Sequence, residues 1–376
     1  MRECDFLIIG AGIAGTSAAF HLVKKGEKVI ILERESQPGY HSTGRSAAVF
    51  TENYGPRLMR VMSVVSGPFL RKPPEGFSDI PLLHQRGVVF IARNDQVDTL
   101  NAIVKELSEL SKTLRSIDKK EVLQRCPMLR AEYPAAGALD DSTADMDVNA
   151  IHQGYLRGAK KGGTEVICDA EVLSLKRAGG KWQLKTKAGD FAAPIVINAA
   201  GAWADVIGEM AGARKIGLQP KRRTAIIFDG PQGVEFAKWP IVADCEEKFY
   251  FKPDSGRMLG SPADETPVPP QDIQPDDEDV ALVADRIETC STLSVKRIVR
   301  KWAGLRSFVK DKCPVVGFAP DTEGFFWLAG QGGYGIQTSY AMGMTAASLL
   351  TGGGVPEAVR ALKVSEADIG PARLWQ

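Results

Sequence analysis

Three glycines near the N-terminus have the spacing of a phosphate-binding turn. Gly10, Gly12 and Gly15 follow an apolar run of strand length, Phe6–Ile9, and open into a helix-patterned segment, Thr16–Lys25. In such a unit the first glycine permits the tight turn, the second removes a side chain that would keep a pyrophosphate off the backbone, and the third lets the helix pack against the strand. The N–H groups at the start of the helix would then face a diphosphate.

An acidic residue completes this pattern. A second apolar run, Lys28–Leu32, ends at Glu33, where a carboxylate can accept hydrogen bonds from the two hydroxyls of an adenosine ribose. Because a 2′-phosphate would be repelled, the pattern predicts FAD or NAD and not NADP. The alternative is a glycine-rich turn without a ligand, but strand, glycines, helix, strand and acid in this order favour the dinucleotide.

Composition narrows the class of partner. The chain has 376 residues, enough for two domains, and its 47 basic and 46 acidic residues give no global field to attract nucleic acid or anionic lipid. A small molecule is therefore the expected partner. Six scattered cysteines and four histidines predict no metal site and suit a reducing compartment. The first apolar strand breaks at glycines, so we expect a cytoplasmic protein without a signal peptide or membrane span.

Periodicity along the rest of the chain predicts alternating strands and helices. Helical spacing covers Leu58–Leu70, a polar-faced helix is expected over Asp95–Leu114, and Asp147 is placed to cap a helix over Val148–Lys161. A proline- and acid-rich stretch, Pro262–Asp279, is expected to be an exposed connection. Further helices are expected near Val280–Ile287 and up to Leu350. Strands are expected over Leu82–Leu83, Val88–Ala92, Glu165–Leu175, Trp182–Thr186, Ala193–Asn198, Thr224–Phe228 and Lys248–Lys252, and within Gly324–Gln337.

Several motifs together resemble a known family, the FAD-dependent D-amino acid oxidase and glycine oxidase superfamily. They are the glycine triplet with Glu33 and Arg34, and the runs His41–Ala48, Asn198–Trp203 and Gly330–Ile336. The resemblance covers essentially the whole chain. Three longer segments are most similar to bacterial D-arginine dehydrogenases: Gln37–Ala48, Gly217–Arg223 and Trp302–Phe308.

With this resemblance, the sequence predicts an α/β fold of two interleaved domains. A Rossmann-like FAD-binding domain, a parallel sheet with helices on both faces, is expected from residues 1–80, 145–213 and 309–376. A substrate-binding domain on a mixed, largely antiparallel sheet is expected from residues 81–144 and 214–308.

The resemblance also implies the cofactor and its contacts. Extended FAD would place its diphosphate at the glycine triplet, its ribose at Glu33 and its flavin near the domain interface, while backbone groups of Val172 would hold the adenine. Cys313 is not where a covalent attachment would align, so we expect non-covalent FAD. The implied cofactor-binding residues are Gly10, Gly12, Ile13, Ala14, Gly15, Glu33, Arg34, Ser42, Thr43, Gly44, Arg45, Ser46, Ala47, Ala48, Thr51, Val172, Gly201, Trp203, Gly332, Gly333, Tyr334, Gly335, Ile336 and Gln337.

Oxidation of an α-amino acid requires a cation for the carboxylate, acceptors for the neutral amine, and a Cα–H aimed at flavin N5. Arginine suits the first task because its planar fork pairs bidentately with a carboxylate. Lys221–Arg223 begins a strand, so only one face of it can line a site, and the family alignment selects Arg223. Arg306 stands among apolar neighbours and should have an anionic partner. The alternative for Arg223 is a solvated surface charge, and the alternative for Arg306 is a structural salt bridge.

Three further residues are candidates for contact with the substrate. Tyr250 faces opposite to its two Phe neighbours and would hydrogen-bond the carboxylate, although a core tyrosine is nearly as plausible. Tyr54 matches a family tyrosine that covers the ligand. The carbonyl of Gly333 is a candidate acceptor for the amine. Hydride transfer from Cα to N5 would leave an imino acid that hydrolyses to a 2-oxo acid and ammonia, a step of amino acid catabolism.

Two departures from the D-arginine dehydrogenases bear on the substrate. Those enzymes carry a histidine where this chain has Val49, and a substrate-pairing glutamate where an ungapped alignment places Val88. We therefore expect D-amino acids with neutral or apolar side chains. An oxidase or dehydrogenase of secondary amines such as sarcosine, proline or hydroxyproline is the near alternative, and a non-catalytic flavoprotein subunit or dinucleotide-dependent regulator is an alternative of another class. The electron acceptor would be oxygen or a quinone-like compound.

Overall fold

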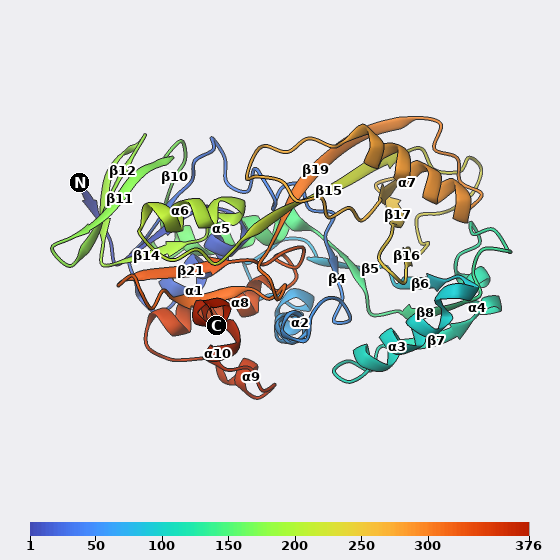
Figure 1. Ribbon diagram of the computed structural model, residues 1–376, viewed down its shortest axis with the longest axis horizontal. Helices are drawn as coiled ribbons and strands as arrows, with labels where there is room; N and C mark the ends of the chain where they lie inside the picture. The colour runs from blue at the N-terminus through green and yellow to red at the C-terminus, as the bar shows by residue number, and fades with distance from the viewer. Residues whose placement is uncertain (376) are drawn as a thin grey trace.

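The computed structural model describes residues 1–375, which form two halves joined by long strands (Figure 1). One half is built on a six-stranded sheet whose strands are parallel except for the last pair. In spatial order its strands are β10 (Glu165–Ile167), β3 (Val29–Leu32), β2 (Phe6–Ile9), β14 (Ile195–Asn198), β21 (Phe325–Ala329) and β20 (Val315–Phe318). Every residue of β2, β3 and β21 is buried, as expected of strands covered on both faces.

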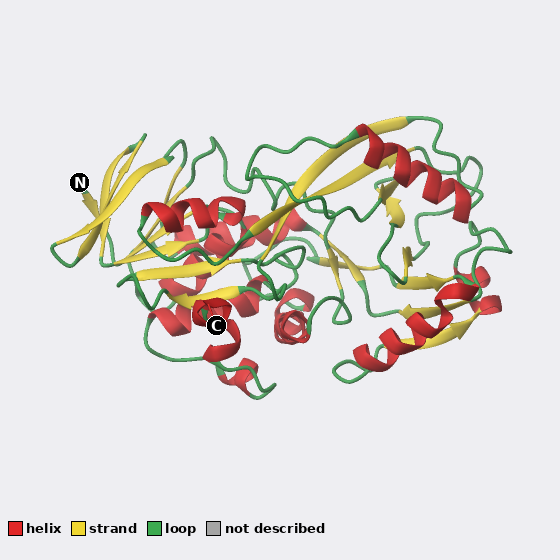
Figure 2. Cartoon of the chain, in the orientation of Figure 1, coloured by secondary structure: helices red, strands yellow, loops and turns green. Residues whose placement is uncertain are grey.

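The two faces of the parallel sheet are covered differently. One face packs on the helices α1 (Ile13–Val23) and α8 (Ser339–Leu350). The other packs on α6 (Ala204–Met210) and on a four-stranded sheet, as Figure 2 shows with helices in red and strands in yellow. The strands of that small sheet are β1 (Arg2–Glu3), β13 (Gly189–Ala193), β12 (Lys181–Thr186) and β11 (Val172–Ala178).

The other half is built on an eight-stranded mixed sheet in which only the β16–β6 pair is parallel. A separate three-stranded sheet consists of β4 (Val49–Phe50), β9 (Ala144–Met146) and β5 (Leu83–Gln85). The eight strands in order are β19 (Ile298–Phe308), β15 (Gln219–Phe228), β18 (Arg257–Ser261), β17 (Tyr250–Asp254), β16 (Ile241–Asp244), β6 (Val88–Ala92), β8 (Ala136–Asp140) and β7 (Leu114–Asp118).

The predicted fold class is confirmed: a Rossmann-like α/β unit is interleaved with a unit on a mixed, largely antiparallel sheet. The domain boundaries given above remain a proposal. No helix within residues 1–375 is long and apolar enough to span a bilayer. The remaining helices are α2 (Arg57–Arg71), α3 (Val97–Leu107), α4 (Lys119–Arg125), α5 (Val148–Lys161), α7 (Asp277–Cys290), α9 (Glu357–Arg360), α10 (Glu366–Ile369) and the short η1 (Asn94–Gln96), η2 (Gly201–Trp203) and η3 (Pro371–Trp375).

Three local predictions need correction. The helix expected to reach Leu114 ends at Leu107, and Leu114 instead begins β7, where Leu114 and Ile117 are buried in the sheet half. The strand expected over Glu165–Leu175 is two strands in different sheets, because Asp169 takes a left-handed backbone conformation (φ 52°) that turns the chain. The stretch Pro262–Asp279 is not a simple exposed connection, because it runs beside β15 and is hydrogen-bonded to it.

Candidate active site

The glycine turn joins β2 to α1 as the sequence predicts. Gly10 has φ 105°, and a Cβ added there would lie 2.4 Å from the carbonyl oxygen of Ala199. A Cβ on Gly15 would lie 2.0 Å from the carbonyl oxygen of Gly10, so only glycine lets α1 pack this close to its strand. α1 begins after Gly12 without a side-chain cap. The N–H of Ile13 donates to Oγ1 of Thr43 at 3.0 Å, and the remaining N–H groups of the first turn would face an anion.

Glu33 lies directly after β3 and is buried. Its Oε2 accepts a hydrogen bond from the backbone N–H of Ala11 at 2.9 Å, and its Oε1 accepts one from the N–H of Glu35 at 3.0 Å. Burial raises the pKa of this carboxyl group. Glu33 thus holds the glycine turn in place, and each of its oxygens keeps lone pairs for a further donor.

Two adjoining cavities run from this turn to the junction of the two halves. They share the lining residues Gly12, Ser42, Thr43, Ala199 and Gly201. Of the predicted residues, the small cavity is lined by Gly10, Gly12, Glu33, Arg34, Ser42, Thr43, Val172, Gly201 and Trp203. The large cavity is lined by Gly12, Ile13, Ala14, Ser42, Thr43, Arg45, Ser46, Ala47, Ala48, Thr51, Tyr54, Gly201, Arg223, Tyr250, Arg306, Gly332, Gly333, Gly335, Ile336 and Gln337.

Three predicted residues lie outside both linings. Gly15 faces the β2–α1 turn, and Gly44 closes its own loop, where a Cβ would lie 2.6 Å from the carbonyl oxygen of Gly39. Tyr334 is buried behind the cavity wall, with its ring 5.0 Å from that of Tyr54. These residues shape the walls without facing the cavities.

The antiparallel pairing of β15 and β19 decides which basic side chains face the large cavity. Arg306 lies opposite Lys221, and Arg223 lies opposite Gly304, so the two arginines share a face of the sheet. Arg222 points to the other face. There it pairs with three carboxylates, those of Asp264, Asp276 and Asp279.

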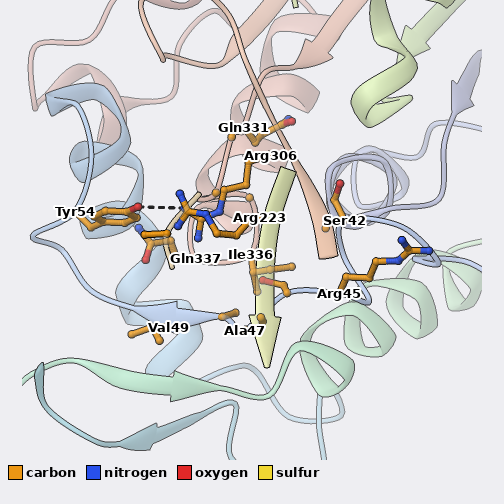
Figure 3. A pocket seen from close by; sticks show the side chains of 18 of the residues that line it. Ser42, Arg45, Ala47, Val49, Tyr54, Arg223, Arg306, Gln331, Ile336 and Gln337 are labelled. Atoms are coloured by element: carbon orange, nitrogen blue, oxygen red, sulfur yellow. Dashed lines mark hydrogen bonds between the residues drawn. The ribbon is translucent and has the colours of Figure 1, made fainter. Parts of the chain in front are cut away.

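Arg306 has no carboxylate partner among residues 1–375, and its Nη1 donates to the hydroxyl of Tyr54 at 3.2 Å (Figure 3). The structural salt bridge considered as its alternative role does not occur among those residues. Arg223 is buried; its Nε donates to the carbonyl of Asp264 at 2.9 Å and its Nη2 lies 3.6 Å from Glu265. Burial, and then the charge of Arg306, lower the pKa of Arg223. The cavity therefore presents two neighbouring cations, a setting that favours an anionic ligand.

Other walls of this cavity are aromatic and aliphatic. Tyr250 lines it, and so does Phe249, which was expected to face the other way; Phe251, on the next position of β17, is buried in the core of the sheet half. Val49 and Val88, the two positions that depart from the D-arginine dehydrogenases, both line the same cavity together with Phe90. A Cβ on Gly333 would lie 2.7 Å from Cζ of Arg306, so glycine allows the backbone to approach the guanidinium closely.

Sequence reasoning missed several polar residues of the site. Gln331 lines the large cavity, and its buried Nε2 has no hydrogen-bond partner within residues 1–375. Glu247, in the turn between β16 and β17, accepts a hydrogen bond from the Tyr54 hydroxyl at 3.3 Å. Glu265 pairs with Lys221 at 2.7 Å. Gln331 stood inside the glycine run that carried the resemblance, but no local pattern marked the two glutamates.

The cysteines do not contribute to the cavity walls. None of the six lines either cavity in the described part of the chain, and burial raises the pKa of the Cys313 thiol to about 11. Residues 1–375 contain no group of three His, Cys, Asp or Glu side chains placed to hold a metal ion.

Comparison with known proteins identifies a family. Residues 5–349 match the family described as FAD dependent oxidoreductase, DAO. The chain is 25% identical to human dimethylglycine dehydrogenase over 264 residues, 69% of this chain and 30% of the human protein. It is also 25% identical to the hydrogen cyanide synthase subunit HcnC of Pseudomonas aeruginosa over 391 residues, 91% of each chain. Its fold is similar to that of L-proline dehydrogenase from P. horikoshii, with a TM-score of 0.85, 22% identity and coverage of 100% and 98%.

The family match spans most of the chain and confirms the resemblance drawn from the sequence motifs. The chain spans only 30% to 41% of the length of the mammalian dimethylglycine dehydrogenases it matches. Members of the matched family depend on FAD. The chain therefore belongs to the FAD-dependent oxidoreductase family of the D-amino acid oxidases and glycine oxidases.

Proposed function

We propose that this protein catalyses the FAD-dependent oxidation of D-amino acids with neutral or apolar side chains to 2-oxo acids and ammonia. The observation that carries the proposal is the convergence of Arg223 and Arg306 on a cavity whose other walls are largely aliphatic and aromatic. Two guanidinium groups suit the carboxylate of an amino acid, and the apolar walls suit its side chain.

The two adjoining cavities fit an extended FAD. The diphosphate would lie at Gly12 and the amide end of α1, and the ribose would lie at Glu33. The unpaired Nε2 of Gln331 supports a polar ligand in the large cavity, because a buried donor without a partner is costly. When bound, FAD supplies the oxidant that takes a hydride from the substrate Cα. Non-covalent binding is supported by the absence of any described cysteine from the cavity walls.

The chain's own residues would bind and orient the substrate. Arg223 and Arg306 would hold the carboxylate, and the hydroxyl of Tyr250 would add a hydrogen bond to it. Tyr54 would cover the ligand and orient Arg306, from whose Nη1 its hydroxyl accepts a hydrogen bond. The carbonyl of Gly333, beside Arg306, would accept a hydrogen bond from the amine. Holding the substrate at both groups fixes its Cα–H in one direction, the main contribution of a protein to such a reaction.

The preference for an uncharged side chain rests on Val49, Val88 and Phe90. These residues line the cavity and offer no partner for a cation. Two acidic residues also line it: the buried carboxylate of Asp244 is engaged by Gln96 and by backbone N–H groups, whereas Glu247 lies in the exposed turn after β16, where it accepts a hydrogen bond from Tyr54. The D configuration rests on the resemblance to the D-arginine dehydrogenases.

Anaerobic mixing tests this proposal. Purified holoprotein is mixed with D-, L- and N-methyl amino acids, and bleaching of the flavin absorbance is recorded. We expect D-leucine and D-methionine to reduce the flavin faster than D-arginine. A strict preference for D-arginine would refute the apolar pocket, and bleaching by L-amino acids alone would refute the D configuration.

A secondary amine is the second candidate substrate. Two of the similar proteins favour it, because they are dehydrogenases of N-substituted amino acids: dimethylglycine is a tertiary amine and L-proline is a secondary amine. The same panel separates the candidates: faster bleaching by sarcosine or proline than by any primary amine would replace the first proposal with the second. If no amine bleached the flavin, a non-catalytic flavoprotein subunit or regulator would be favoured. The identity of the electron acceptor stays a prediction, as does a cytoplasmic location.

A further inference from the structure

The connection between β18 and α7 follows β15 closely; we call residues 262–276 the strap. The carboxylate of Asp264 accepts a hydrogen bond from the N–H of Thr224 at 2.6 Å. Further along, the N–H of Arg222 donates to the carbonyl of Thr266 at 2.9 Å, and the N–H of Val268 donates to that of Pro220 at 3.0 Å. These hydrogen bonds fix the first part of the strap to β15 of the eight-stranded sheet.

The last part of the strap reaches across to the other half of the molecule. Arg45 forms an ion pair with Asp272, and its Nη1 donates to the carbonyl of Ile273 at 3.0 Å. The hydroxyl of Tyr40 donates to the second oxygen of Asp272 at 3.4 Å. Ile273 is buried in a small apolar cluster with residues of both halves, including Ala202. Asp272 therefore contacts two side chains of one short loop.

That loop, residues 39–46, lies where the two cavities meet. Tyr40 lines the small cavity, Arg45 lines the large one, and Ser42 and Thr43 line both. Its inner side is fixed to β19, because Ser42 Oγ donates to the carbonyl of Leu305 at 2.7 Å. A ligand that occupies both cavities must pass beside this loop.

We propose that the strap keeps this loop closed over the bound FAD, and that Asp272 is the positioning residue that joins the two. The guanidinium of Arg45 binds Asp272 and the carbonyl of Ile273 in the strap and the carbonyl of Ala303 in β19, so this side chain joins the loop to both. Loss of Asp272 frees the loop to open, and FAD leaves faster.

The test measures FAD release and not turnover. Holoprotein is diluted, and the rise in flavin fluorescence is followed as FAD leaves. D272A is expected to release FAD about three- to five-fold faster than wild type, the size of effect that a partly exposed ion pair gives. D272N, which keeps the shape and loses the charge, should release FAD at an intermediate rate. D277A is the matched control, since Asp277 pairs with Lys301 and contacts neither the loop nor a cavity.

The role of the strap rests on FAD lying in the two cavities, as proposed above. The placement of FAD and the role of the strap can fail separately. If wild type retained no FAD, the cofactor placement would fail. If D272A and D272N kept the far-UV spectrum of wild type and released FAD at its rate, or if D277A accelerated release as much as D272A, the strap would have no such role.

Discussion

Replacing Arg306 by methionine tests the central feature of the site, a buried cation without a carboxylate partner. Methionine fills a similar volume and removes the charge together with the donor to Tyr54. A structural ion-pair arginine would leave an unpaired carboxylate behind when replaced, which is strongly destabilising. Arg306 would leave none among residues 1–375. We therefore expect R306M to lose activity without losing stability.

The expected loss of activity follows from the contact that R306M removes, the proposed pairing of Arg306 with the substrate carboxylate. Truncating one partner of a desolvated, hydrogen-bonded charge pair costs about 2–5 kcal/mol, and each 1.4 kcal/mol is a factor of ten. The kcat/KM of R306M for its best D-amino acid should thus fall by about 30- to 4,000-fold, measured by steady-state turnover with a dye acceptor. Its melting temperature should equal or exceed that of wild type.

R222M is the matched control, since Arg222 neighbours Arg223 on β15 but pairs with Asp264, Asp276 and Asp279 on the other face. This substitution leaves three carboxylates without their partner, so the free energy of unfolding should fall by about 3–5 kcal/mol. The folded fraction should keep kcat/KM close to that of wild type. A large fall in the melting temperature of R306M with little change in kcat/KM would show that Arg306 is structural and refute the reasoning.

Three further predictions concern specificity, the cofactor and pH. V88E places a carboxylate in the cavity wall, so the ratio of kcat/KM for D-arginine to that for D-leucine should rise at least about tenfold. An unchanged ratio would show that Val88 does not contact the side chain of the substrate. Q331L removes a buried donor, so FAD affinity, measured by fluorescence titration of apoprotein, should weaken by about 5- to 30-fold, and equal affinity would show that Gln331 does not contact FAD. Arg45 holds the pKa of Asp272 below its usual value of 3.8. The ion pair of Asp272 with Arg45 is therefore complete above pH 3.8 and is lost as the pH falls through the lowered pKa. The difference in FAD release between wild type and D272N should be constant from about pH 5 to 8 and shrink in stronger acid. A difference that changed between pH 6 and 8 would contradict this assignment.

Elements governed by neighbouring residues were predicted well. α5 spans Val148–Lys161 as expected, because Asp147 accepts a hydrogen bond from the N–H of Ala150 and fixes the start of the helix. The glycine turn also formed as expected, since its conformation depends on residues next to one another. The helix expected to reach Leu114 was wrong because burial of Leu114 in β7 is decided by β8, a distant strand that pairs with it.

Beyond the nucleotide-binding turn, residues of the proposed site were predictable only where the family resemblance marked them. Glu265 and Asp272 lie in a proline- and acid-rich stretch whose composition is typical of an exposed loop. Their partners, Lys221 and Arg45, are distant in the sequence. No local pattern could reveal these ion pairs, because they depend on how the strap crosses β15 and the loop of residues 39–46.

The sequence by itself determined the nucleotide-binding turn, because Gly10, Gly12, Gly15 and Glu33 act through one short strand–helix–strand unit. Only the tertiary structure decided that Arg223 and Arg306 share a cavity. The register of β15 on β19 sets them on one face and sends Arg222 to the other, and a shift of one residue would reverse the faces. Such pairing between distant strands depends on the packing of the whole sheet.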